Sequence, residues 1–270
     1  MRKRRTLIVS LLGQLAVEFR LFWRRRQSVY LAFLVPMLGM ALLVYLGKEG
    51  LLESFFTLAA RGLGAGADLS KVGSPMAFLT VGLIAYSLID VAFESLVPSV
   101  VRERESGILK RLGGTPLRRW TFVLAKALNA SLLVLAEVAV ILLMGLASSE
   151  IEVAGDFWSM AAILLLGVFT FAALSFVLSG LMATVGSAVA AVHAVYIPMI
   201  LLSGAFVPVS VLPKALRAVA RVLPLTYFVR PFRSVLVVGQ SLADCRGDLL
   251  VLLAWAVGAW LVAIKVFRWE

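Results

Sequence analysis

Three acidic residues and one histidine lie inside stretches of the sequence that are otherwise apolar. Asp90 and Glu94 are four positions apart, so a helix would place them on one face, while Glu137 and His193 each stand alone. An ionised side chain at the centre of a bilayer costs roughly 2.5–3.5 kcal/mol on insertion scales, so such residues should face protein or water. Glu137 is either a functional carboxylate or a protonated one that is hydrogen-bonded across helices. His193 is interpreted first as a buried packing residue, with a ligand or pH-sensing role as the alternative.

Asp90 and Glu94 admit three interpretations. If they lie near the end of their helix, they pair with bases of the following loop and fix helix packing. The bases in reach along the sequence are Arg102, Arg104 and Lys126. The other two interpretations are that the carboxylates line a path for a solute or that they relay protons.

The chain carries no catalytic constellation. It has no P-loop, no Ser/His/Asp set and no Cys/His spacing that suits a metal ion, so we expect no metal, no bound cofactor and no ATP hydrolysis by this chain. The segment GLGAGAD at residues 62–68 superficially offers a nucleotide-binding glycine pattern, but it follows no predicted strand and reads as a flexible external loop. The single cysteine, Cys245, cannot form an intrachain disulfide.

A charged segment at residues 101–128, VRERESGILKRLGGTPLRRWTFVLAKAL, lies between two long apolar stretches. It holds two acidic and seven basic residues. A helix begun near Glu103 would have acids at its start and bases at its end, as the helix dipole prefers, and Gly113 with Gly114 would end it in a left-handed cap. The sequence Thr115–Pro116 then predicts the start of a new helix. The short helix would carry one small apolar stripe, formed by Ile108, Leu109 and Leu112.

The composition is that of a chain embedded in a lipid bilayer. Hydrophobic residues make up 61% of the 270 residues, charged residues 15%, and the mean hydropathy is +1.00. The net charge of +11 comes from bases that flank apolar stretches, which is how membrane topology is set, and no nucleic-acid recognition module is present. We therefore predict an integral membrane protein that does not bind nucleic acid.

We predict an all-α membrane protein with six spans and an amphipathic helix that precedes them. Residues 8–22 show apolar positions at helical spacing and should lie in the membrane interface, where the surrounding bases face lipid headgroups. A cleaved signal peptide is disfavoured because charged residues follow the apolar run. The predicted spans are residues 29–46, 75–97, 120–146, 157–182, 187–206 and 249–267.

The distribution of charge predicts the orientation. Eight basic residues precede the first span and seven lie in the charged segment, whereas the loop after the third span holds Glu150, Glu152 and Asp156 and no base. Both termini and the charged segment are therefore expected in the cytoplasm, in a cell (inner or plasma) membrane.

The region between the last two spans is broken by prolines. Residues 211–223 and 231–238 can each form a short helix separated at Pro224, which predicts a re-entrant hairpin at about residues 207–240 on the outer side. Its arginines either grip lipid headgroups or anionic cargo, or they extend to the interface. The residues that define the region are Phe206, Pro208, Pro213, Pro224, Tyr227, Arg230 and Arg233.

The charged segment resembles the cytoplasmic loop of ABC-2 type exporter permeases. The matching residues are ERESGILKRLGGTPL at 103–117, with Lys126 further on, although Lys110 stands where the family often has an acid. A second block at residues 198–233, PMILLSGAFVPVSVLPKALRAVARVLPLTYFVRPFR, is similar to the family's pattern before its last span, with Leu223 in place of a frequent asparagine. The looser likeness covers most of the chain and points to the drug and antibiotic resistance branch.

The resemblance implies a division of the chain and a set of partners. Residues 1–27 would be a cytoplasmic basic tail with an elbow helix, and 28–270 the ABC-2 transmembrane domain. The partners would be two copies of a separate ATP-binding subunit, which holds ATP and Mg²⁺, and a second permease, either identical or a paralogue, surrounded by membrane lipids. The implied coupling residues are Glu103, Arg104, Glu105, Gly107, Ile108, Leu109, Lys110, Arg111 and Leu112.

Under this interpretation the chain is not an enzyme but the translocation subunit of an exporter for an amphiphilic or lipid-like cargo such as a drug, an antibiotic or a glycolipid. Asp90, Glu94, Glu137 and His193 become candidates for the translocation path. The alternative is a secondary permease or a membrane-embedded enzyme that acts without an ATPase partner.

Overall fold

The computed structural model describes residues 13–20, 26–54, 57, 74–114, 119–149 and 151–266, with the side chains of 26–32 and 119 excepted. Every regular element within these ranges is a helix, as the composition predicts. The start of the interfacial helix, the loop with the glycine pattern at 62–68 and the predicted helix start at 115–116 lie outside the described residues.

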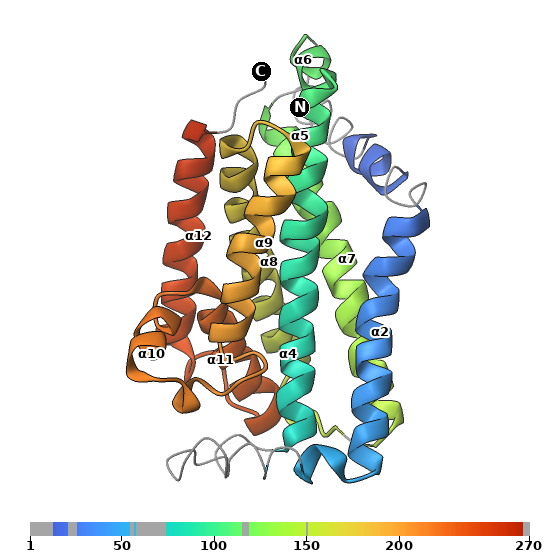
Figure 1. Ribbon diagram of the computed structural model, residues 1–270, viewed down its shortest axis with the longest axis vertical. Coiled ribbons are helices and arrows are strands. Elements are labelled where there is room, and N and C mark those ends of the chain that lie inside the picture. The colour runs from blue at the N-terminus through green and yellow to red at the C-terminus, as the bar shows by residue number, and fades with distance from the viewer. Residues whose placement is uncertain are drawn as a thin grey trace, which may run out of the picture.

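Long helices run alongside one another in a single bundle (Figure 1). The short helix α6, the turn between α8 and α9, and the end of α12 lie at one end of the bundle, and α10 and α11 lie at the other. The elements with their bounds are α2 (Arg26–Lys48), α4 (Pro75–Ile89), η2 (Asp90–Leu96), α5 (Val97–Glu105), α6 (Ile108–Gly113), α7 (Arg119–Ala147), α8 (Phe157–Leu181), α9 (Val185–Leu202), η3 (Val209–Val211), α10 (Lys214–Ala220), α11 (Pro224–Val238) and α12 (Arg246–Val266).

Five helices of the described chain are long and apolar enough to cross a membrane. They are Pro75–Glu105, Trp120–Ala147, Phe157–Leu181, Val185–Leu202 and Arg246–Val266. In α2 the apolar part with described side chains, Phe33–Lys48, is shorter than these. The chain is therefore a multi-pass membrane protein, and its sixth span stays a prediction.

The helix Pro75–Glu105 is continuous over 31 residues and is longer than a bilayer requires. At 1.5 Å per residue it extends about 46 Å, against roughly 30 Å of hydrocarbon, so one end must project beyond the apolar layer. The predicted end of this span at residue 97 was too early, because the helix runs on through Arg102, Glu103 and Arg104. The charged segment thus begins within this long helix, Pro75–Glu105, which we call the rod.

The middle of this rod, Asp90–Leu96, is π-helical, and a neighbouring helix satisfies part of its backbone. The buried Ser175 on α8 donates its hydroxyl hydrogen to the carbonyl oxygen of Ala92. Segments of this kind widen the helix and are frequent at functional sites.

Close packing fixes α11 inside the bundle, although two prolines occur in it. Pro224 occupies the first turn, where a missing N–H costs nothing, and Pro231 lies within the helix. The predicted helix start at residue 231 was therefore wrong, because burial of the α11 face outweighs the hydrogen bond that Pro231 cannot make. Phe228 and Phe232 are fully buried and stack with ring centroids 5.4 Å apart.

The turn between α8 and α9 is set by local capping. The Thr184 hydroxyl accepts the backbone N–H of Ser187 at 3.2 Å, and the Ser187 hydroxyl reaches back to the backbone of Thr184, which forms a capping box. At the opposite end of α8, Asp156 accepts the N–H of Ser159 at 2.9 Å. That hydrogen bond lowers the pKa of Asp156, because it favours the charged form.

We predict that Gly82→Ala destabilises the bundle. A methyl group on Gly82 would lie 2.5 Å from the carbonyl oxygen of Ala205, which belongs to the backbone and cannot swing away. Overpacking of this kind costs about 1–3 kcal/mol. The midpoint of thermal unfolding in detergent should fall.

The matched control is Gly258→Ala, since nothing lies within 4 Å of a methyl group built at Gly258 and both glycines are helical. Equal midpoints for the two variants would contradict the close approach at Gly82.

Candidate functional site

The short helix α6 projects from one end of the bundle (Figure 1). Gly107 adopts a left-handed conformation with φ of 69°, which stops the long rod at Glu105 and lets α6 begin at Ile108. The sequence placed the start of this helix near Glu103 and the left-handed cap at Gly113 or Gly114. Both placements were wrong: α6 ends at Gly113, and Gly114 is right-handed with φ of −79°.

One side of α6 is fastened to α7. Leu109 is fully buried and forms a small apolar cluster with Phe122, against which Leu112 and Val123 also pack. This cluster is separate from the main core of the bundle, so α6 has its own anchor. The predicted apolar stripe is therefore divided: Leu109 and Leu112 pack against α7, whereas Ile108 is exposed.

The other side of α6 faces outward. The Ile108 side chain is 43% exposed, and Lys110 and Arg111 are exposed beside it. An exposed β-branched residue beside two bases, held on a rigid short helix, is a surface suited to a protein partner with an apolar pocket and an acidic rim.

Lys126 lies buried directly behind α6 and shares its charge between two acids. Its Nζ lies 2.8 Å from Glu103 Oε1 on α5 and 3.0 Å from Glu18 Oε2 on the helical segment 13–20, and its side chain is only 3% exposed. Ser99 completes the cluster, because its hydroxyl donates to Glu103 at 3.2 Å and accepts from Lys126 at 3.3 Å. The ions therefore join three chain segments that are far apart in sequence.

The two neighbours of Glu103 on the rod join it to further helices. Arg104 donates to the carbonyl oxygens of Ser179, at 3.1 Å, and Met182, which are unpaired groups at the end of α8. Glu105 accepts the N–H of Val185 at 3.3 Å at the start of α9, where a negative charge is favoured. Each of the three residues Glu103, Arg104 and Glu105 thus contacts a different helix.

A cavity of about 40 Å³ adjoins the buried lysine, and Glu18, Ser99, Lys126 and Asn129 contribute its polar lining together with Ser95. A space of this size is large enough for a water molecule. The side-chain oxygen of Asn129 is buried without a hydrogen-bond partner among the described residues, and a water molecule in this cavity would supply one.

The second group of predicted residues lies further along the same rod. Asp90 lies within electrostatic range of Glu94 on the same rod and of the Glu137 carboxylate from α7. Glu137 is only 1% exposed and lies against the Ser87 hydroxyl, but neither group makes a hydrogen bond of standard geometry in the described part of the chain. The tertiary structure therefore unites carboxylates that the sequence left on separate helices.

The partner of Glu94 is His193 on α9, whose Nε2 lies 3.3 Å from Glu94 Oε1. The predicted pairing of this region with Arg104 and Lys126 was wrong, because those bases are engaged with α8 and with Glu103. The prediction of a buried packing histidine was also wrong, since half of the His193 side chain is exposed.

The arginines at the opposite end bind protein groups. Arg233 donates to Gly204 O at 2.9 Å and lies 3.8 Å from the centroid of the Phe78 ring, and Arg230 lies 3.9 Å from Asp248. These contacts give both arginines a structural role that sequence reasoning did not foresee.

The other residues predicted in this region form its turns. Pro208 and Pro213 precede η3 and α10, Pro224 begins α11, and Phe206 lies against Gly82. The Tyr227 hydroxyl donates to Arg221 O at 2.5 Å.

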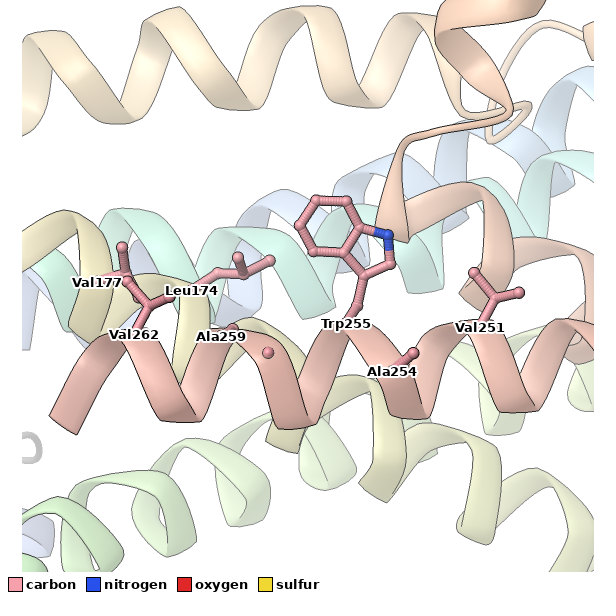
Figure 2. A pocket seen from close by; sticks show the side chains of 8 residues that line it. Leu174, Val177, Val251, Ala254, Trp255, Ala259 and Val262 are labelled. Carbon is pink, nitrogen blue, oxygen red and sulfur yellow. The ribbon is translucent and has the colours of Figure 1, made fainter. Parts of the chain in front are cut away.

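An apolar groove of about 510 Å³ lies between α8 and α12 (Figure 2). Trp255 and Val262 of α12 and Leu174 and Val177 of α8 form part of its wall. No residue that lines it is ionisable, so the groove offers no chemistry beyond contact with apolar groups. Within the described ranges, no group of three His, Cys, Asp or Glu residues could hold a metal ion.

Two residues of the site were missed from the sequence. Glu18 had one usable signal, because it interrupts an apolar helical pattern. Phe122 had none, since aromatic residues in apolar helices are normally packing residues.

The comparisons with known proteins agree with this architecture. A family model described as ABC-2 type transporter matches residues 14–237. The "Probable multidrug ABC transporter permease YbhR" of Escherichia coli strain K12 is 26% identical over 170 residues, and the same holds for the protein of that name in Escherichia coli O157:H7. Each alignment covers 63% of this chain and 46% of the relative, so the chain spans about half the length of the curated relatives it matches.

We predict that Lys126→Met strongly destabilises the protein, because it leaves Glu18 and Glu103 as buried charges without a counterion. Removing one partner of a buried ion pair costs about 3–5 kcal/mol. The measurement is the thermal unfolding midpoint of the purified protein.

Lys110→Met is the control, since Lys110 is exposed. The triple variant Glu18→Gln, Glu103→Gln and Lys126→Met removes all three charges and should recover part of the lost stability. An unfolding midpoint for Lys126→Met that equals the control would show that the buried ions do not hold these segments together.

Proposed function

We propose a function from one premise: the chain belongs to the ABC-2 type transporter family, whose model matches residues 14–237. The protein is the transmembrane subunit of an ATP-driven exporter, and a separate ATP-binding subunit supplies the energy. This chain is not the enzyme of the complex; ATP and Mg²⁺ bind in the partner.

The observation that carries the proposal is the build of α6. It combines a buried anchor, Leu109 on Phe122, with an open face of Ile108, Lys110 and Arg111. This is the arrangement expected of a coupling helix that docks into a groove of a soluble subunit, because the docking face must be free while the helix itself stays rigid. Of the residues that the resemblance implied for coupling, these three would contact the partner.

The remaining coupling residues transmit the motion. Glu103, Arg104 and Glu105 connect the base of α6 to Lys126, to the end of α8 and to the start of α9. Closure of two ATP-binding subunits would displace α6, and the ion pairs would carry that displacement into the helices as a rigid-body movement. Gly107, with its left-handed backbone, is the joint between α6 and the rod.

The assembly needs a second permease subunit to complete a pathway between two bundles, either an identical copy or a paralogue, with two ATP-binding subunits. The protein would lie in the cell membrane with both termini and α6 in the cytoplasm. Residues 1–27 would then form the basic tail with its interfacial helix, and the α10–α11 region would be the re-entrant hairpin on the outer side.

The cargo is proposed to be amphiphilic or lipid-like, such as a drug, an antibiotic or a glycolipid. The relatives named multidrug permeases support this class. Asp90, Glu94, Glu137 and His193 lie in the bundle where such a cargo would pass, and they are proposed to line its path.

We predict that Ile108→Asp prevents stable association with the ATP-binding subunit. A charge placed at the centre of an apolar contact should reduce co-purification of the co-expressed subunit by at least about tenfold, equivalent to ~1.4 kcal/mol. The measurement is the ratio of the two subunits after affinity purification from membranes.

Val222→Asp is the control. Val222, like Ile108, has an exposed β-branched side chain, but it lies next to α10 at the other end of the bundle. Equal amounts of both variants in the membrane are required. Retention of the subunit by Ile108→Asp would exclude α6 as the docking element.

The orientation can be tested with single cysteines. Because Cys245 is the chain's one native cysteine and is buried, Cys245→Ala supplies a background for Lys110→Cys and Val222→Cys. A membrane-impermeant maleimide added to intact cells should label Val222→Cys, whereas Lys110→Cys should be labelled only after the membranes are opened. The reverse pattern would invert the proposed topology.

A further inference from the structure

A partly buried cluster of carboxylates and tyrosines spans three helices of the bundle. The rod Pro75–Glu105 contributes Tyr86, Asp90 and Glu94, α7 contributes Glu137, and α9 contributes Tyr196 with His193. Asp90 lies within electrostatic range of both Glu94 and Glu137, and both tyrosines lie within reach of the two carboxylates of the rod.

The cluster holds more acid than base. Its one ion pair within the described chain is the contact of His193 with Glu94, and the nearest bases along the rod, Arg102 and Arg104, lie beyond the π-helical segment. Lys126 is already shared by Glu18 and Glu103. No basic side chain of the described residues therefore forms an ion pair with Asp90 or Glu137.

Glu137 supplies an independent observation that something is missing from its surroundings. Its carboxylate is buried against the Ser87 hydroxyl, but neither group makes a hydrogen bond of standard geometry with any described residue. Burying a carboxylate without a partner is costly in an apolar medium. A positively charged ligand would remove that cost.

The tyrosines make the site suited to an organic cation rather than a bare ion. The rings of Tyr86 and Tyr196 meet edge to face, with centroids 6.1 Å apart, beside Asp90. Aromatic rings attract alkylated or arylated ammonium and phosphonium groups while also contacting their apolar parts. A metal ion would instead need three close oxygen or nitrogen ligands, and none of the described residues form such a group.

The cluster is exposed at one end and buried at the other. The side chains of His193 and Glu94 are 50% and 28% exposed, whereas Glu137 is only 1% exposed. A ligand would therefore reach the cluster from the His193–Glu94 pair on the side of α9.

We propose that the residues Tyr86, Asp90, Glu137 and Tyr196 form a binding site for the cationic group of an amphiphilic organic molecule, with Glu94 and His193 at its entrance. This inference rests on the proposed export function and specifies the charge of the cargo. It assigns the carboxylates to electrostatic recognition, the tyrosines to contact with the cation, and Glu137 to the deepest position.

The test is the binding of tetraphenylphosphonium to the protein in lipid nanodiscs, with and without its ATP-binding subunit, by equilibrium dialysis against empty nanodiscs. Tetraphenylborate is the matched probe, because it has the same shape and apolar surface but the opposite charge, and it is measured in a separate dialysis since the two ions precipitate together. We expect saturable binding of the cation and none of the anion. Equal saturable binding of the two ions would overturn the proposal.

Two conservative variants locate the site. Asp90→Asn and Glu137→Gln should each weaken binding of the cation by about tenfold, and bound cation should raise the unfolding midpoint of the native protein but not of Glu137→Gln. Glu152→Gln, which changes an exposed acid in the loop before α8, should bind like the native protein. Unchanged binding in both site variants would overturn the proposal.

The tyrosine contribution is separable from charge and from folding. Tyr196→Phe keeps the ring and should bind within about twofold of the native protein, whereas Tyr196→Ala should lose several-fold in affinity. If Glu137→Gln does not fold, Asp90→Asn and the two Tyr196 variants still decide the question, and equal affinity of all three would count against the site.

The outcomes also separate this inference from the export function. Association with an ATP-binding subunit and ATP-driven movement of another cargo, together with no binding of tetraphenylphosphonium, would reject the cation site alone. Saturable binding of the cation by a chain that recruits no ATP-binding subunit would keep the site and reject the export function.

Discussion

The structure depends on one buried lysine, Lys126, that forms ion pairs with two acidic residues. Lys126 on α7 holds Glu103 of the long rod at 2.8 Å and Glu18 of the segment before the first long helix at 3.0 Å. Because a buried charge is tolerated only with its counterions in place, this three-ion cluster fixes where the rod, α7 and segment 13–20 meet. The short helix α6 continues directly from that junction, so its position is determined by electrostatics as well as by the contact of Leu109 with Phe122.

The long rod joins the two polar regions of the bundle. Its charged end carries Glu103, Arg104 and Glu105, and its middle carries Asp90 and Glu94 in a π-helical segment. A helix is stiff along its axis, so a displacement at one end reaches the other end when the turns between them stay hydrogen-bonded. The π-helical segment is the place where that stiffness is interrupted, and Ser175 of α8 compensates for it at Ala92. In the proposed transporter, this segment would convert movement at α6 into a change at the acidic cluster.

The opposite end of the bundle is held by hydrogen bonds to backbone carbonyls rather than by ion clusters. Arg233 bonds to Gly204, Thr226 bonds to Ala220, and Tyr227 bonds to Arg221. Prolines break the chain into short helices whose ends need partners, and these side chains supply them. The region can therefore stay compact without long regular elements.

The amino-acid sequence by itself determined the all-helical membrane character and most of the long helices, because apolar length is a local property. The spans predicted at 120–146 and 249–267 agree with α7 and α12 to within three residues at each described end. It also located the end of α6, because Gly113 and Gly114 are local stop signals, although it placed the start of the helix near Glu103 and the left-handed residue wrongly. Only the tertiary structure decided the partners of the charged residues: Lys126 with Glu18 and Glu103, His193 with Glu94, and Glu137 facing Asp90. These pairings join residues that are far apart along the chain, and no periodicity within one helix encodes which neighbour a buried charge will meet.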